Sequence, residues 1–191
     1  LTTLRKVGSY LQGHPDMKHI PGVDMSSGSL GQGISAAVGM ALSAKLSGDS
    51  YRVYTLLGDG EIQEGQVWEA AMLAAHRKLD NLVVIVDNNN LQIDGAIDEV
   101  NSPYPIDQKF EAFNFHVINV DGHDFDALDA AFKEAKATKG CPTAIIAKTV
   151  KGKGVSFMEN QASWHGAAPN DEQYETAMAD LEKVGEALCQ K

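Results

Sequence analysis

The part of the sequence that is most informative about the fold is GDGEIQEGQVWEAAMLAAHRKLDNLVVIVDNNNLQIDG, residues 58–95. An apolar run, residues 52–57 (RVYTLL), leads into it, and a second run, residues 82–86 (LVVIV), lies inside it. Residues 66–79 carry apolar side chains around much of a helix, which predicts a largely covered helix. Continuous apolar strands separated by helices are typical of a parallel sheet covered on both faces. The stretch therefore predicts an α/β fold.

The same alternation continues on both sides of this stretch. We expect helices at residues 30–46, 125–138 and 170–188, and strands at residues 115–120 and 143–150. Residues 152–169 show no periodicity and indicate a long ordered loop, a kind of segment that is often functional. No internal repeat or second domain is visible. We therefore expect residues 1–191 to form one domain with a parallel central sheet and helices on both faces.

Polar residues follow both apolar strands at the same edge of the expected sheet. Asp59 comes directly after the first strand, and Asn89 follows the second, 30 residues later (89 − 59 = 30). In open parallel sheets, ligands bind beyond the carboxyl ends of the strands. A hard cation such as Mg²⁺ takes about six oxygen ligands from carboxylates, amides, carbonyls, water and phosphate. Gly-Asp-Gly alone is more typical of an ordinary turn, but the two residues together predict a metal site that anchors a diphosphate.

Composition narrows the class of protein. The formal net charge of −10 argues against nucleic acid as a partner, because that partner requires a basic face. No apolar run approaches the roughly 18 residues that span a bilayer, so no membrane association is expected. The two cysteines, Cys141 and Cys189, lack metal-type spacing and indicate reduced thiols in a cytoplasmic protein. The chain opens on Leu1 rather than Met, and we expect an N-terminal part to be missing.

Four blocks of the sequence resemble the transketolase family of thiamine-diphosphate enzymes. They are GHPDMKHIPGVDMSSGSLGQG (13–33), the stretch 58–95, VDGHD (120–124) and TVKGKGVSFMENQASWHG (149–166). The resemblance covers most of the chain, from about Ser9 to Gly166. It implies a diphosphate-binding (PP-type) domain that holds thiamine diphosphate and Mg²⁺, with Ca²⁺ or Mn²⁺ as alternative ions.

The resemblance also implies roles for particular residues around the metal. Asp59 and Asn89 would ligate the ion through their side chains, and Leu91 through its carbonyl. Asn89 would also contact the cofactor, and the backbone of Gly60 would meet the diphosphate. Gly28 and Leu30, in the GSLGQG turn, would lie near the thiazolium and aminopyrimidine rings. The helix after that turn is expected to add its N-terminal dipole to a local anion site.

Two of the six histidines fall on motif positions of the family. The resemblance places His14 (GHP) and His165 (WHG) near the thiazolium, the diphosphate and the ketose hydroxyls, where an imidazole suits proton transfer. His165 is therefore expected to be both catalytic and cofactor-binding. Glu64 is also expected to be catalytic, because it matches a glutamate that joins an acidic network across the subunit interface and links paired active sites. His123 (VDGHD) is expected to hold a loop in place.

The implied reaction is transfer of a two-carbon ketol unit from a ketose phosphate to an aldose phosphate, as in the pentose phosphate pathway. A pyrimidine-binding domain is needed to complete the active site. We expect it to come from a separate subunit or domain, in a heterotetramer or homo-oligomer, with this chain as the N-terminal subunit of a split transketolase or as a fragment. Three alternatives remain: deoxyxylulose-phosphate synthase, the decarboxylating component of a 2-oxoacid dehydrogenase, and a non-catalytic assembly subunit.

Overall fold

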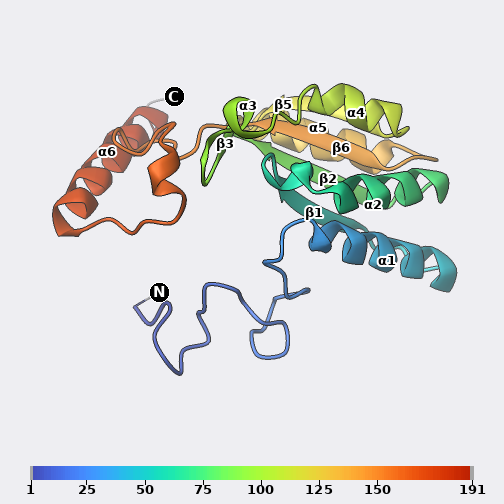
Figure 1. The fold of residues 1–191 in the computed structure, drawn as a ribbon, viewed down its shortest axis with the longest axis horizontal. Coiled ribbons are helices and arrows are strands. Elements are labelled where there is room, and N and C mark those ends of the chain that lie inside the picture. Colours follow the sequence, from blue (N-terminus) through green and yellow to red (C-terminus); the bar gives the residue numbers. More distant parts are fainter. Residues whose placement is uncertain (1, 190–191) are drawn as a thin grey trace.

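The computed structural model describes residues 2–189 and contains a parallel four-stranded sheet, as predicted (Figure 1). The strand order is β1-β2-β6-β5. The strands are β1 (Val53–Gly58), β2 (Leu82–Asn88), β5 (His116–Asp121) and β6 (Thr143–Lys148). The main helices are α1 (Gln32–Ser47), α2 (Gly65–His76), α4 (Ile106–Ala112), α5 (Phe125–Ala137) and α6 (Asp171–Cys189). In the register, Gly58 lies beside Asp87, which brings the ends of β1 and β2 together.

Alternate residues of the central strands β2 and β6 point to opposite faces of the sheet. Val84 and Ala144 belong to the larger core cluster, which includes buried residues of α1, α2 and α4. Val83 and Ile145 belong to a second cluster, which α5 covers through Ala131 and other residues. Successive side chains of a strand point to opposite faces, so an uninterrupted apolar strand is required where both faces are covered.

Right-handed crossovers explain which helix covers which face. From β1 to β2 the chain advances along the sheet, and α2 packs on one face. From β2 to β5 it advances again, and α4 packs on the same face. From β5 to β6 the direction reverses, so a right-handed connection must place α5 on the opposite face, as found.

Most of the predicted elements are confirmed, with shifts at their ends. Helix α2 stops at His76 rather than Leu79, because Lys78 adopts a left-handed conformation (φ 51°) that ends the helix. Helix α4 was not predicted, since it is short and follows a Pro-rich segment. The hairpin of β3 (Leu91–Gln92) and β4 (Gly95–Ala96), the short helix α3 (Ile97–Val100) and the 3₁₀ turns η1 (Glu61–Gln63) and η2 (Ala162–His165) were also missed.

The two ends of the described chain lie outside the sheet and its covering helices. Residues 2–31 form turns without a helix or strand, and α6 lies beyond one end of the sheet with the loop that precedes it (Figure 1). The backbone N–H and hydroxyl of Ser156 donate to Asp180 and tie that loop to α6. Within residues 2–189, no helix combines the length and the apolar character needed to cross a bilayer.

Candidate metal and cofactor site

Asp59 lies buried where β1 ends, with only 1% of the residue exposed. Its Oδ2 atom accepts hydrogen bonds from the Asn90 N–H (2.6 Å) and the Asn88 side-chain amide (3.1 Å), and Oδ1 accepts from the Gly60 N–H (2.9 Å). The carboxylate is therefore fastened to the loop that follows β2. The two strand-end turns recognised in the sequence form one local structure.

The surroundings of Asp59 suit a cation. Burial raises the pKa of the Asp59 carboxyl, the three hydrogen bonds oppose that rise, and the nearby charge of Asp87 adds to it. Within residues 2–189, no lysine, arginine or histidine forms an ion pair with Asp59. A buried carboxylate is costly without a positive partner. An ion with oxygen ligands fits this position, and the donor atoms present are carboxylate and amide oxygens.

Asn89 and Leu91 lie on the same loop. Asn89 is 9% exposed, and its Oδ1 accepts a hydrogen bond from the Leu91 N–H (3.0 Å). Because Asp59 binds the residues on both sides of Asn89, the two expected side-chain ligands occupy adjoining turns. Leu91 begins strand β3. The structure thus brings together all three residues that were expected to hold the metal.

Gly60 occupies a position where a side chain would not fit well. A Cβ atom there would lie 3.0 Å from Cβ of Gln92. The Gln92 amide is in turn fixed, because its Oε1 accepts a hydrogen bond from Gln63 (2.7 Å). The close approach explains the glycine. The Gly60 N–H itself points to Asp59 in this structure.

Tyr104 is part of this site and was missed by sequence reasoning. Its hydroxyl accepts a hydrogen bond from the Asn88 side chain (2.7 Å) and donates to Oδ1 of Asn90. Burial raises the pKa of Tyr104, and the charge of Asp59 contributes to the rise. Residues 103–105 are Pro-Tyr-Pro and gave no signal beyond a turn, so only the folded chain shows the contact.

The N-terminal residues with expected roles form a second group. Gly28 has a φ of 143°, and a Cβ atom there would overlap the imidazole of the exposed His14. These two residues therefore lie in direct contact, as a shared site requires. Leu30 is 60% exposed and, with Gly28, lines a cavity of about 770 Å³.

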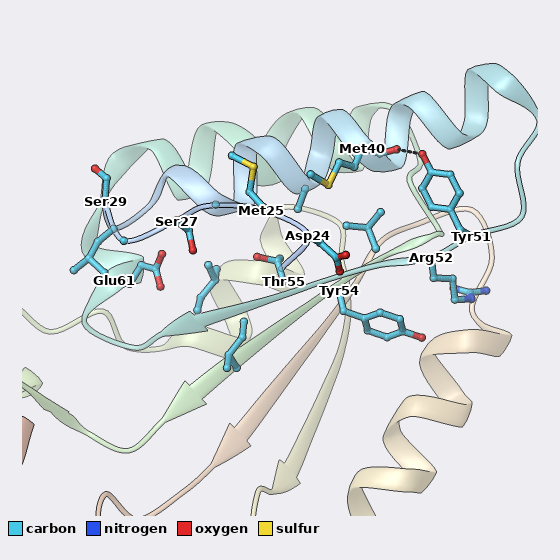
Figure 2. Close-up of a pocket in the computed structure, with 17 residues that line it drawn as sticks. Asp24, Met25, Ser27, Ser29, Met40, Tyr51, Arg52, Tyr54, Thr55 and Glu61 are labelled. Atoms are coloured by element: carbon cyan, nitrogen blue, oxygen red, sulfur yellow. Dashed lines mark hydrogen bonds between the residues drawn. The ribbon is translucent and has the colours of Figure 1, made fainter. Parts of the chain in front are cut away.

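This cavity lies along the edge strand β1, beneath residues 24–30 and α1 (Figure 2). Its lining includes Gly28, Leu30 and Glu61 but neither Asp59 nor Asn89. The cavity therefore adjoins the candidate metal loop, residues 89–91 after β2, rather than containing it. The candidate site is the buried polar network around Asp59, where carboxylate and amide oxygens lie together.

Glu61 is a second residue that sequence reasoning missed. Its carboxylate accepts hydrogen bonds from the Gly31 N–H (2.9 Å) and the Gly58 N–H (3.0 Å). Gly31 is the N-cap of α1, so a carboxylate of the chain itself occupies that donor. The expectation that the start of α1 serves a local anion site is revised accordingly: the anion at its N-cap is Glu61.

Glu64 lies at the start of α2. It is exposed and does not cap the helix with its side chain. The Cβ atom of Glu64 packs closely against Gly31, since a Cβ atom added at Gly31 would lie 2.8 Å from it. The carboxylate is thus accessible, which is compatible with a contact to another subunit.

The expected histidines of the C-terminal half lie as follows. His165 is exposed and ends η2, which lies against β3 and hence beside the candidate metal loop. The loop before it is anchored by the Trp164 indole N–H, which donates to the Phe157 carbonyl (3.0 Å). The role expected for His123 is confirmed, because its Nε2 accepts a hydrogen bond from the Val150 N–H (2.8 Å) and joins two loops.

The site residues thus form two groups that meet at the turn of residues 58–61. Asp59, Gly60, Asn89, Leu91 and the segment bearing His165 lie toward the β3 side. His14, Gly28, Leu30 and Glu64 lie toward the start of α1. Within that turn, Asp59 binds Asn88 and Asn90 at the end of β2, and Glu61 binds the Gly31 N–H at the start of α1.

Comparison with solved structures fits the class that this arrangement defines, a thiamine-diphosphate-binding α/β domain. Transketolase from Campylobacter jejuni superposes with a TM-score of 0.87 at 35% identity, over 94% of this chain and 29% of that one. Transketolase from Pichia stipitis, in a complex with fructose 6-phosphate, gives a TM-score of 0.88 at 31% identity, over 94% of this chain and 28% of that one.

Sequence comparison gives the family. The model "Transketolase, thiamine diphosphate binding domain" matches residues 1–182. The 6-deoxy-6-sulfo-D-fructose transketolase subunit of Clostridium sp. (strain MSTE9) is 45% identical over 97% of this chain and 67% of its own length. Human transketolase is 49% identical over 87% of this chain but only 26% of its own length. The chain belongs to the transketolase thiamine-diphosphate-binding-domain family.

Proposed function

We propose that this chain is the diphosphate-domain subunit of a transketolase and transfers a two-carbon ketol unit from a ketose phosphate to an aldose phosphate. The observation that carries the proposal is the buried Asp59 carboxylate, held between Asn88 and Asn90 with no basic partner among residues 2–189. Several relatives are named transketolase subunits, which supports a chain that works with a second polypeptide.

In this proposal, Asp59, Asn89 and the Leu91 carbonyl hold Mg²⁺, and Gly60 allows the diphosphate to approach the backbone. Gly28 and Leu30 face the rings of the cofactor. Thiamine diphosphate, when bound, supplies the electron sink for breaking and forming a carbon–carbon bond next to a ketone.

The remaining site residues act on the substrate and on the assembly. His14 and His165, both exposed, would hold the ketose hydroxyls and move protons at those oxygens. Glu64, exposed at the start of α2, would join a contact with another subunit. A pyrimidine-binding domain from a partner completes the site, in a cytoplasmic oligomer that serves a pathway such as the pentose phosphate pathway.

An assay with xylulose 5-phosphate and ribose 5-phosphate tests the reaction, with the chain purified together with the subunit that completes it. We expect both sugars to be consumed only when thiamine diphosphate and Mg²⁺ are present. A chelator should abolish turnover, and added Mg²⁺ should restore it. Turnover of pyruvate alone would point instead to the synthase or the 2-oxoacid dehydrogenase component.

The metal assignment has its own test. We expect the double variant Asp59→Ala/Asn89→Ala to lose thiamine diphosphate binding at saturating Mg²⁺, measured by titration calorimetry. The control is Asp126→Asn, which changes an exposed aspartate of α5. Binding by the double variant with wild-type affinity would remove Asp59 and Asn89 from the site. Absence of binding by the wild-type assembly would favour a non-catalytic subunit.

A further inference from the structure

Glu61 connects two parts of the chain that nothing in the sequence links. It lies on η1, between the Gly-Asp-Gly turn and α2, and its side chain is partly buried. One carboxylate oxygen accepts the Gly31 N–H (2.9 Å) and the other accepts the Gly58 N–H (3.0 Å). Figure 2 shows Glu61 at the end of the cavity where Ser27 and Ser29 lie.

The two amides belong to the two turns that surround the proposed cofactor site. Gly31 ends the turn that contains Gly28 and Leu30, and Gly58 opens the turn that contains Asp59 and Gly60. The Glu61 carboxylate therefore spans the gap between the turn proposed to face the cofactor rings and the turn proposed to face its diphosphate.

The chemistry of the bridge requires a carboxylate. Both partners are N–H donors, so both side-chain oxygens must be acceptors, and an ionised carboxylate offers two. Glutamine would accept at one oxygen and place an NH₂ group against the other N–H donor. Aspartate is one methylene shorter. The negative charge is also favourable at the start of α1, where the helix dipole is positive.

The turn that carries Glu61 is itself firmly held. The indole N–H of Trp68, on α2, donates to the Ile62 carbonyl (3.0 Å). Ile62 is fully buried. Gly31 has a φ of 80° and fits closely against Glu64. The turn of residues 28–31 can therefore approach the start of α2 only because residue 31 has no side chain. The bridge is thus anchored on the rigid α2 side and reaches toward the irregular N-terminal side.

We propose that Glu61 is a positioning residue that sets the separation between the turns 28–31 and 58–60. The inference rests on the proposed function, in which these turns face the two ends of thiamine diphosphate. Glu61 uses both oxygens on the backbone, so it acts on the cofactor through the two turns rather than by contact.

The variant Glu61→Gln, with Glu69→Gln as control, tests this inference. Glu69 is exposed on α2, so the control makes the same charge change at a position outside the bridge. The first measurement, on the assembly without cofactor, is hydrogen–deuterium exchange of peptides covering residues 28–34 and 57–63. We expect Glu61→Gln to exchange about tenfold faster in the peptide whose N–H faces the new NH₂ group, as loss of a charged hydrogen bond predicts, and faster than wild type by a smaller factor in the other peptide, where the acceptor becomes neutral. The control should match the wild type.

The second measurement is the Kd for thiamine diphosphate at saturating Mg²⁺. We expect Glu61→Gln to raise this Kd about tenfold while kcat at saturating cofactor changes by no more than about twofold. Glu61→Asp, which keeps the charge and can reach only one amide, should raise it about threefold. If Glu61→Gln does not purify in a folded form, Glu61→Asp carries the test.

Two results would overturn the inference, and they differ from each other. A lower melting temperature with unchanged exchange and unchanged Kd would make Glu61 a stabilising residue only. Failure of the wild-type assembly to bind thiamine diphosphate with Mg²⁺ would remove the proposed function, and the positioning role with it. In the second case, the exchange data would still show whether the bridge between the two turns exists.

Discussion

In strand β2, Leu82, Val83, Val84 and Val86 are each at most 1% exposed, whereas helix α6 contains no buried residue. Strand β2 has a neighbouring strand on each side and a core cluster on each face. Helix α6 is joined to the loop that precedes it by hydrogen bonds from Ser156 to Asp180. Both segments are regular secondary structure, but only β2 is held in place by packing on every side.

The apolar residues of α6 show why the two regions differ. Large apolar residues recur every three or four positions along α6 and so share one face of the helix. They are Tyr174, Met178, Leu181, Val184 and Leu188. They are between 39% and 64% exposed. The amphipathic pattern is sufficient to form a helix, but burial within this chain contributes little to its stability. Asp59 follows β1 directly and the candidate metal loop follows β2 directly, so the candidate site depends on the packed region.

The largest effect should come from removing packing in β2. Leu82 is fully buried in the larger core cluster. We expect Leu82→Ala to lower the free energy of unfolding by about 3 kcal/mol, because the lost burial is compounded by a cavity. Urea denaturation followed by circular dichroism measures this. A loss below about 1 kcal/mol would mean that β2 is not the centre of the core.

A smaller effect is expected at the start of β2, where Asp80 joins three segments. Asp80 accepts hydrogen bonds from Lys45, near the end of α1, and from the Gly140 N–H (3.0 Å), before β6. Burial alone would raise the pKa of Asp80, but the Gly140 N–H and the Lys45 ammonium group hold it below the ordinary aspartate value.

The sign of the pH dependence follows from that lowered pKa. The contribution of Asp80 is fully present above the ordinary aspartate pKa and is lost as pH falls through the lower pKa of the folded state. We expect Asp80→Asn to lower the free energy of unfolding by about 1 kcal/mol at pH 7, a value that allows for solvent screening of the pair with Lys45. The difference from wild type should shrink at pH 3 and below. Denaturant midpoints at a series of pH values would check this, and a constant difference would contradict it.

The sequence predicted best those elements whose structure depends on residues close together in the chain. The apolar strands, the helix α1 and the strand-end positions of Asp59 and Asn89 follow from local patterns, and the structure confirms them. Glu61 and Tyr104 could not be predicted, because their partners lie far along the chain or in another loop. Their residue types carry no signal by themselves: a glutamate after Gly-Asp-Gly and a tyrosine between two prolines are both typical of turns.

The attachment of α6 should be separable from the stability of the sheet. The Ser156 hydroxyl donates to Asp180 (2.6 Å), and both residues lie outside the core clusters. We expect Ser156→Ala to speed hydrogen–deuterium exchange in residues 171–189 by about threefold, as loss of one hydrogen bond predicts. Exchange in residues 82–88 should stay at the wild-type rate. A parallel increase in both peptides would show that α6 and β2 open together.

The smallest effect should come from the matched partner of Leu82. Leu188 has the same side chain but is 64% exposed, near the end of α6. We expect Leu188→Ala to change the free energy of unfolding by no more than about 0.5 kcal/mol, because little apolar surface is returned to water and no cavity forms. The measurement is the same urea titration, made on the isolated chain and on the assembly with the proposed pyrimidine-domain partner. If Leu188→Ala lowers the free energy of unfolding of the isolated chain as much as Leu82→Ala does, packing does not distinguish α6 from β2. A cost that appears only in the assembly would place the apolar face of α6 against another polypeptide and leave the comparison within this chain intact.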